Sequence, residues 1–141
     1  MRKSVITVLC LLLVFGAVDA FADAMTAGDM LAEARANIMQ APASVGKVLF
    51  DEGTYVFIDV REPNETNMGF IPGAILIPRG LLEFRIGGAV EDQSAQIVVY
   101  CKSGGRSSLA AYTLKQMGYT NVISMAGGWG AWTAAAYPMA E

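Results

Sequence analysis

The sequence has 141 residues, 54% of them apolar, with ten basic and 13 acidic side chains and a net charge of −3. This length and composition suit one domain around a single buried core. The absence of histidine excludes Cys-His and Ser-His-Asp catalysis and argues against the usual zinc sites. There is no basic stripe, so nucleic acid is not an expected partner, and we expect neither a metal nor a cofactor.

The first 22 residues have the layout of a secretory signal peptide. A short basic segment precedes an apolar run over residues 5–18, which is shorter than the roughly 20 residues that a membrane-spanning helix needs. We expect cleavage after Ala22, with Ala20 and Ala24 as alternative positions. An uncleaved membrane anchor is the competing interpretation. The segment therefore predicts an exported, periplasmic protein that meets the membrane only during export.

Cleavage would leave one cysteine, Cys101, because Cys10 lies within the apolar run. The mature monomer would then form no internal disulfide. A lone thiol in an exported protein is open to oxidation and is a candidate reactive group.

Downstream of the signal segment, residues 26–40 follow the pattern of an amphipathic helix with Thr26 as its N-cap. We expect this helix to pack against its own domain rather than to dock a partner. It belongs to an N-terminal helical extension, residues 23–43, whose role the sequence leaves open. The main domain is expected over residues 44–141.

Within the main domain the pattern alternates between strand and helix. A helix is expected over residues 44–52 and should end at Gly53. Further strands and helices follow in turn, with strands at 55–59, 74–77, 97–100 and 121–125 and helices at 79–86, 106–117 and 127–136. Such alternation predicts an α/β domain with a mostly parallel sheet.

A glycine-rich loop follows the clearest strand. Cys101 opens this loop, which continues with Lys102, Ser103, Gly104 and Gly105 before a helix that starts near Arg106. In open parallel sheets, ligands bind beyond the carboxyl ends of the strands. The N–H groups of such a loop can point inward as an anion-binding nest, and the helix N-terminus adds positive potential. Both lower the pKa of a thiol, so Cys101 is the candidate nucleophile; the competing interpretation is a small buried apolar residue.

Two stretches resemble the rhodanese-like family. Residues 98–132, which contain Y-C-K-S-G-G-R-S-S and A-G-G-W, resemble the second half of a rhodanese domain. Residues 58–78, with I-D-V-R-E-P and G-F-I-P-G-A, resemble its first-half signature. The resemblance covers roughly residues 44–137 and implies a sheet of about five mostly parallel strands with helices on both faces.

The resemblance also implies a chemistry. Cys101 would take the outer sulfur of a small anionic donor such as thiosulfate and hold it as a persulfide. Cyanide or a thiol, such as that of a thioredoxin-like protein, would then accept the sulfur. This is the activity of a thiosulfate:cyanide-type sulfurtransferase.

Roles for individual residues follow from the same resemblance. The N–H groups from Lys102 to Ser107 would stabilise the persulfide. Lys102, Arg106 and Arg61 are expected to attract the donor, although a solvated charged rim is the alternative for all three. Two supporting residues complete the set: Asp59, which would fix loop geometry, and Trp129, beside the entrance.

One departure from the family pattern is visible. Phe70 stands where the family often has histidine after glycine, and this change bears on loop packing rather than on catalysis.

Other functions remain as alternatives. A cysteine phosphatase or arsenate reductase would need five residues between cysteine and arginine, whereas four separate Cys101 from Arg106 and the sixth position is Ser107. Non-catalytic interaction modules of this fold typically lack the cysteine. A periplasmic persulfide carrier with little thiosulfate turnover is harder to distinguish from the sequence, which also leaves the physiological donor, the acceptor and the oligomeric state open.

Overall fold

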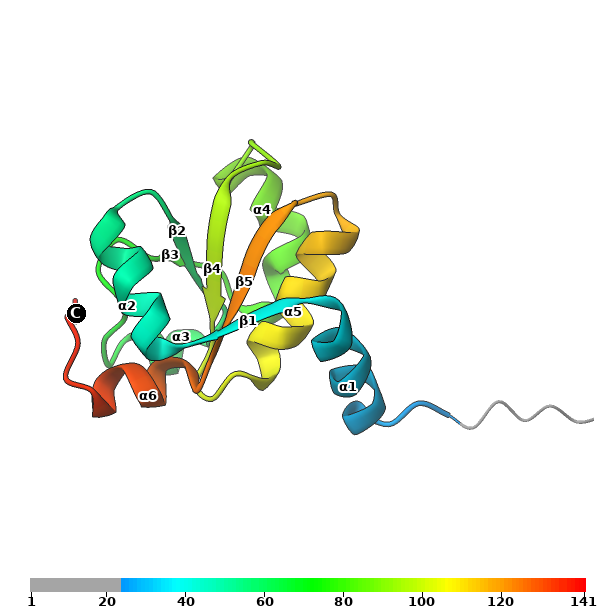
Figure 1. Ribbon diagram of the computed structural model, residues 1–141, viewed down its shortest axis with the longest axis horizontal. Coiled ribbons are helices and arrows are strands. Elements are labelled where there is room, and N and C mark those ends of the chain that lie inside the picture. Colours follow the sequence, from blue (N-terminus) through cyan, green and yellow to red (C-terminus); the bar gives the residue numbers. More distant parts are fainter. Residues whose placement is uncertain (1–23) are drawn as a thin grey trace, which may run out of the picture.

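The computed structural model describes residues 24–141. They form one five-stranded, all-parallel sheet in the order β1-β5-β4-β2-β3, with helices on both faces (Figure 1). This confirms the predicted α/β class and the mostly parallel sheet. The strands are β1 (Met39–Pro42), β2 (Val56–Asp59), β3 (Ile75–Leu76), β4 (Gln96–Tyr100) and β5 (Asn121–Ala126). The helices are α1 (Ala27–Asn37), α2 (Ala43–Glu52), α3 (Pro63–Thr66), α4 (Leu82–Ala89), α5 (Gly105–Gln116) and α6 (Gly128–Ala134), with a 3-10 turn η1 (Arg79–Leu81).

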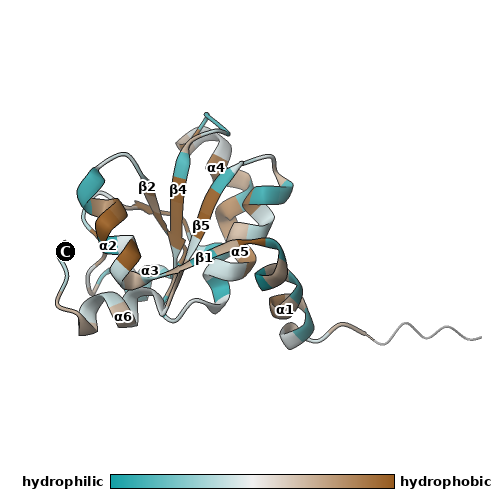
Figure 2. Cartoon of the chain, in the orientation of Figure 1, coloured by the Kyte–Doolittle hydropathy of each residue, from teal (hydrophilic) through white to brown (hydrophobic). Residues whose placement is uncertain are grey.

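The core has two layers, one on each side of the sheet. One joins the sheet to α4 and α5, and the other joins it to α2 and α6. Strand β4 lies in the middle, and its residues from Ile97 to Tyr100 are fully buried. Figure 2 shows the apolar residues concentrated on β4 and β5. A strand buried on both faces must be apolar throughout, which is why the run 97–100 was the clearest strand signal in the sequence.

The helix predicted over residues 26–40 is wrong at its C-terminal end. Helix α1 ends at Asn37, Ile38 is extended, and Met39–Pro42 pairs in parallel with β5 as the edge strand β1. Two physical reasons favour the strand. Proline disfavours helical geometry in the residue before it, and β5 would otherwise leave its backbone groups unpaired. Part of the predicted extension therefore belongs to the sheet.

Helix α1 packs against α5, as expected for a helix that covers its own domain. Its N-terminus is a capping box, in which the Thr26 hydroxyl accepts the Asp29 N–H at 3.2 Å and the Asp29 carboxylate accepts the Thr26 N–H at 2.8 Å. At the other end the Lys115 ammonium donates to the Asn37 carbonyl at 2.7 Å. The buried side chain of Ala34 faces the domain. Residues 27–37 are therefore a fixed part of this fold.

The remaining predictions differ from the structure only at element ends and in one short helix. Helix α2 begins one residue earlier than expected and closes at Gly53, whose φ of 71° is left-handed. The helix predicted over residues 79–86 is a 3-10 turn followed by α4. Helix α5 ends at a Met117 C-cap, and Gly118 follows it. The single-turn helix α3 was not predicted, because its four residues are too few to produce a periodic signal.

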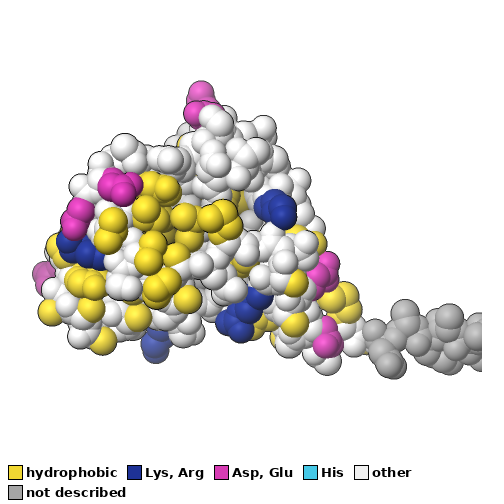
Figure 3. Space-filling view, viewed as in Figure 1, with side chains coloured by type: hydrophobic (Ala, Val, Ile, Leu, Met, Phe, Trp, Pro, Cys, Tyr) yellow, Lys and Arg dark blue, Asp and Glu magenta, His cyan; other side chains and the backbone are white. Residues whose placement is uncertain are grey.

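Exposed apolar side chains gather over α2 and β1, where Met39, Val45 and Val48 contribute exposed atoms (Figure 3). Within residues 24–141 no helix combines the length and apolar character needed to span a bilayer. The signal peptide predicted over residues 1–22, together with Cys10, lies outside the described residues.

Candidate active site

The carboxyl ends of β2, β4 and β5 meet at one edge of the sheet, and Cys101 is the first residue after β4. The Cys101 side chain is only 1% exposed. It is the one cysteine within the described residues, and it is not in a disulfide. The loop therefore places a free thiol at the edge where parallel sheets bind ligands.

Groups of its own loop surround the thiol. The Gly104 N–H donates to Cys101 Sγ at 3.1 Å, and Ser107 Oγ lies 3.7 Å from the same sulfur. Gly104 has a φ of 106°, a conformation that turns its N–H toward the sulfur and that side chains other than glycine's rarely adopt. Helix α5 starts at Gly105, one residue earlier than predicted. The helix N-terminus therefore lies beside Cys101.

Two opposing effects act on the Cys101 thiol. Burial raises its pKa, whereas the backbone N–H groups of Ser107, Gly104 and Ser103 and the Ser107 hydroxyl lower it. The net result is a pKa below the ordinary value of a cysteine. The loop thus favours the thiolate without histidine, and hydrogen bonds to the charged form are the physical cause.

A row of hydroxyl groups supports the loop from below. Ser124 Oγ, on β5, donates to Ser107 Oγ at 3.0 Å, and Ser108 Oγ donates to the Gly104 carbonyl at 2.7 Å. All three serine side chains are buried. Neither Ser124 nor Ser108 was predicted from the sequence. A polar residue within a buried apolar strand was the one available signal for Ser124.

The loop between β5 and α6 lies directly against the cysteine loop. The Trp129 N–H donates to the Cys101 carbonyl at 2.7 Å, and the Gly130 N–H donates to the Lys102 carbonyl at 3.0 Å. A Cβ atom on Gly128 would lie 2.2 Å from the Cys101 carbonyl oxygen. Only glycine permits this approach, so the G-G-W motif holds the cysteine loop in place.

The Arg61 guanidinium is fully engaged within the protein. It forms an ion pair with Asp59, at 2.6 Å between Nη2 and Oδ2, and donates to the Gly69 carbonyl at 2.8 Å. The Trp129 ring covers it at 4.5 Å. Arg61 and Asp59 are 2% and 0% exposed. Asp59 thus lies where a residue that fixes loop geometry would lie, while donor binding by Arg61 stays a prediction.

Arg106 also has an acidic partner. Its two terminal nitrogens donate to the two Glu65 carboxylate oxygens at 2.7 and 2.8 Å. This bidentate hydrogen bonding lowers the pKa of Glu65 to about 2, against a smaller opposing effect of burial. Glu65 lies in α3, three residues after the N-cap Glu62, whose N–H it accepts at 3.0 Å. Glu65 was not predicted from the sequence, because Glu62 is not one of the residues that mark the start of a capping box.

A cavity of about 260 Å³ adjoins the cysteine loop, and we call it the entrance cavity; it is lined by Arg61, Glu65, Met68, Lys102 and Trp129. Lys102 is exposed and has no ion-pair partner among residues 24–141. The structure therefore brings together three residues that the sequence analysis had named for the site. Met68, 82% exposed, was not among them.

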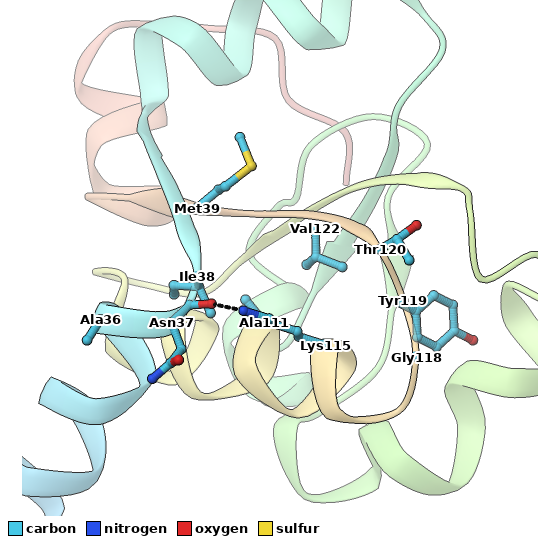
Figure 4. A pocket seen from close by; sticks show the side chains of 10 residues that line it. All are labelled: Ala36, Asn37, Ile38, Met39, Ala111, Lys115, Gly118, Tyr119, Thr120 and Val122. Atoms are coloured by element: carbon cyan, nitrogen blue, oxygen red, sulfur yellow. Dashed lines mark hydrogen bonds between the residues drawn. The ribbon is translucent and has the colours of Figure 1, made fainter.

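A larger cavity of about 610 Å³ lies between the α1–β1 segment and α5 (Figure 4). Its one charged side chain, Lys115, donates to the Asn37 carbonyl. The smaller cavity, not this one, is lined by Lys102, which follows Cys101 in the chain, and by Trp129, whose N–H donates to the Cys101 carbonyl, so we assign the chemistry to the smaller one.

The segment carrying Phe70 is held by the C-terminus. Phe70 and Ala140 exchange two backbone hydrogen bonds, each of 2.9 Å. This short antiparallel bridge fixes the loop that carries phenylalanine where the family often has histidine.

Comparisons with known proteins agree with this geometry. The family model described as "Rhodanese-like domain" matches residues 43–135. A sulfurtransferase from Allochromatium vinosum is 34% identical over 96 residues, which span 68% of this chain and 88% of that protein. The thiosulfate sulfurtransferase PspE from Escherichia coli is 39% identical over 71 residues, which span 50% of this chain and 68% of that protein.

A solved structure extends the similarity to most of the chain. It is a protein of unknown function from Rhodopseudomonas palustris, described as a possible tyrosine phosphatase, with a TM-score of 0.78 and 33% identity. The match covers 83% of this chain and 96% of that one.

Proposed function

The chain belongs to the rhodanese-like domain family and acts in rhodanese-type sulfur transfer, and we propose that Cys101 carries a sulfane sulfur from a thiosulfate-like donor to cyanide or a thiol. One observation carries the proposal. Cys101 is a buried free thiol whose sulfur accepts the Gly104 N–H and whose pKa the loop holds below its ordinary value, despite burial. Such a group is a thiolate nucleophile that needs no general base.

In the first step the Cys101 thiolate attacks the outer sulfur of thiosulfate. A sulfur–sulfur bond forms between Sγ and that atom, and the bond between the two donor sulfurs breaks. Its electron pair leaves with sulfite. The products are an anionic persulfide on Cys101 and one sulfite, so atoms and charge balance.

The persulfide carries its negative charge on the outer sulfur. The N–H groups of the loop from Lys102 to Ser107 precede and begin helix α5, and such a set of donors stabilises an anion in a site from which water is largely excluded. The close packing of Gly128 and Trp129 on this loop keeps the donors in place. The protein thus contributes a preorganised electrostatic environment.

In the second step an acceptor removes the outer sulfur. Cyanide attacks it, the bond to Sγ breaks, and thiocyanate leaves with the Cys101 thiolate regenerated. A thiol acceptor reacts in the same way as its thiolate and leaves as a persulfide, which suits a thioredoxin-like protein as physiological acceptor.

The charged residues divide the remaining roles. Lys102 is the exposed cation at the entrance, so it is the residue that best suits attraction of the anionic donor. Arg106 is bound to Glu65 and Arg61 to Asp59, and their support is therefore more indirect.

Phosphatase activity fits the loop less well. A phosphate-binding loop needs space for a tetrahedral oxyanion and an arginine that grips two of its oxygens. Here Arg106 points both nitrogens at Glu65, and the next residue is the buried Ser107. The shorter loop suits a single sulfur atom.

Export is a further part of the proposal and rests on the sequence of residues 1–22 alone. N-terminal sequencing of the protein recovered from the periplasm should give Asp23 as the first residue. Recovery of an intact N-terminus in the membrane fraction would favour an anchor instead.

Mass spectrometry of the intact protein tests the chemistry. After thiosulfate treatment the wild type should gain the mass of one sulfur atom, whereas Cys101→Ser should gain none. An unchanged wild-type mass would refute sulfur transfer from this donor. Cyanide should then remove the added sulfur as thiocyanate. A persulfide that forms but resists cyanide would instead favour the carrier function.

A further inference from the structure

The entrance cavity contains one carboxylate among its cations. Of the residues that line it, Arg61 and Lys102 are basic and Glu65 is acidic. The charge of Arg61 is already balanced by Asp59. The charge that an incoming donor meets therefore depends on Lys102 and on the pair formed by Glu65 and Arg106.

Glu65 holds Arg106 in a fixed geometry. Each carboxylate oxygen accepts a hydrogen bond from one terminal N–H of the Arg106 guanidinium, and one of them also accepts the Glu62 N–H. A bidentate pair of this kind occupies the two N–H groups that would otherwise grip an anion. With its pKa lowered to about 2, Glu65 is fully ionised near neutral pH.

We infer that Glu65 is the specificity-determining residue for donor charge: it withholds Arg106 from the donor and places its own negative charge at the entrance, and it thereby narrows the advantage that Lys102 gives a dianionic donor over a monoanionic one. This inference rests on the proposed function. Glu65 acts through Arg106 and through the local field, so it is a positioning residue. The donors that gain from Glu65 relative to thiosulfate are singly charged sulfane compounds, such as thiosulfonates and persulfides.

The size of the effect should scale with donor charge, because the interaction between two charges is proportional to their product. Replacing Glu65 with glutamine removes one negative charge and releases Arg106. Salt screens this field only partly over the few ångströms involved. We expect the rate constant for reaction with the donor to rise about tenfold for a dianion and about threefold for a monoanion. Doubling the donor charge doubles the change in interaction energy, and this squares the ratio of the variant's rate constant to that of the wild type.

Two donors of different charge test this scaling. Thiosulfate is a dianion and releases sulfite, whereas methanethiosulfonate is a monoanion and releases methanesulfinate when a thiolate takes its outer sulfur. The measurement is the second-order rate constant of persulfide formation in a single turnover, followed by release of those products. Glu65→Gln should raise it about tenfold for thiosulfate and about threefold for methanethiosulfonate.

Two further variants serve as controls. Glu65→Asp keeps the charge and should leave the ratio of the two rate constants within about twofold of wild type. Asp51→Asn changes net charge by the same amount in an exposed pair on α2, and it should leave both rate constants unchanged. Equal changes for the two donors in Glu65→Gln would mean that Glu65 is merely structural and would overturn the inference.

A second measurement does not depend on sulfur transfer at all. Iodoacetate is an anion and iodoacetamide is neutral, and both alkylate the Cys101 thiolate. Their rate ratio cancels any change in the thiolate fraction. Glu65→Gln should raise the ratio of iodoacetate to iodoacetamide about threefold, and the increase should shrink in concentrated salt. An unchanged ratio would refute the inference even if the wild type forms a persulfide, and a raised ratio would support it even if the proposed donor proves wrong.

Discussion

Two arginine–carboxylate pairs stand at the same edge of the sheet, and they differ chiefly in their contact with water. Asp59 and Arg61 are 0% and 2% exposed, whereas Glu65 and Arg106 are 24% and 35% exposed. The buried pair cannot change its charge or partner without leaving an unsolvated ion. The pair at the rim can change its charge or its partner at little cost in free energy, because water solvates both groups. The same chemistry therefore serves as a fixed support in one place and as an adjustable electrostatic element in the other.

The surroundings of the two guanidinium groups explain this division. Arg61 donates to the Gly69 carbonyl and lies under the Trp129 ring, so it connects β2, the following loop and α6. Arg106 connects α5 with α3 and faces solvent on its other side. Variants that remove one partner at a time should reveal the difference as a graded series of stabilities.

The largest effect is expected from Asp59→Asn. This change leaves the Arg61 guanidinium charged, buried and without its counter-ion. We expect a loss of about 3 kcal/mol or more in the free energy of unfolding, measured by urea denaturation. A loss below about 1 kcal/mol would mean that water reaches Arg61 and that the pair is not the fixed support described above. Replacing both partners by uncharged residues of similar volume should recover part of the loss.

The next largest effect is expected from Trp129→Leu. Leucine keeps an apolar side chain over Arg61 but removes the ring whose face meets the guanidinium at 4.5 Å. The expected loss is about 1–2 kcal/mol in the same measurement. Ala134→Ser, at an exposed position at the end of α6, provides a control in the same helix. If the two variants lose equal stability, the contribution comes from helix α6 rather than from the ring.

A smaller, pH-dependent effect is expected from Glu65→Gln. Solvent screens the pair, so the loss should be at most about 1 kcal/mol near neutral pH. Hydrogen bonding to Arg106 lowers the pKa of Glu65 in the folded state to about 2 from 4.5. The stability it contributes is therefore fully present above about 4.5 and is lost as the pH falls toward about 2. Urea unfolding at a series of pH values should show the two proteins converge through that range; a constant difference would exclude ionisation of Glu65 as its cause.

The smallest effect is expected from Asp51→Asn. Its pair with Lys47 spans one helical turn on the surface of α2, and the Asp51 side chain is 58% exposed. Such pairs contribute about 0.3–0.5 kcal/mol. The free energy of unfolding of this variant, measured by urea denaturation, should be nearly the same in low salt and in high salt. A loss as large as that of Glu65→Gln would remove the distinction between the rim of the site and the ordinary surface.

Much of the fold could be predicted from periodicity alone. The buried strand over residues 97–100 and the alternation around it indicated the α/β class, and Gly53 marked the end of a helix. Strand β1 could not be predicted, because Met39–Pro42 is only four residues long and mostly exposed, and it is a strand only because it pairs with β5. Helix α3 is too short to produce a periodic signal.

The site was predictable where chemistry depends on one residue and its neighbours in the chain. Cys101 and the loop after it are local features, since strand, glycines and helix N-terminus follow one another in sequence. Glu65 was not predictable as a partner of Arg106, which lies 41 residues away. The same holds for Ser124 beneath Ser107 and for Gly128 against the Cys101 carbonyl.

The sequence by itself determined the α/β class, the position of the nucleophile and a loop able to lower its pKa, because these depend on short-range patterns of burial, glycine and charge. Only the tertiary structure decided which cation stays exposed. Arg61 and Arg106 are bound to carboxylates and Lys102 is not. The sequence alone does not distinguish these three basic residues, because only folding brings a carboxylate next to two of them. Since the field at a site is the sum over all neighbouring charges, its strength at Cys101 is a property of the fold.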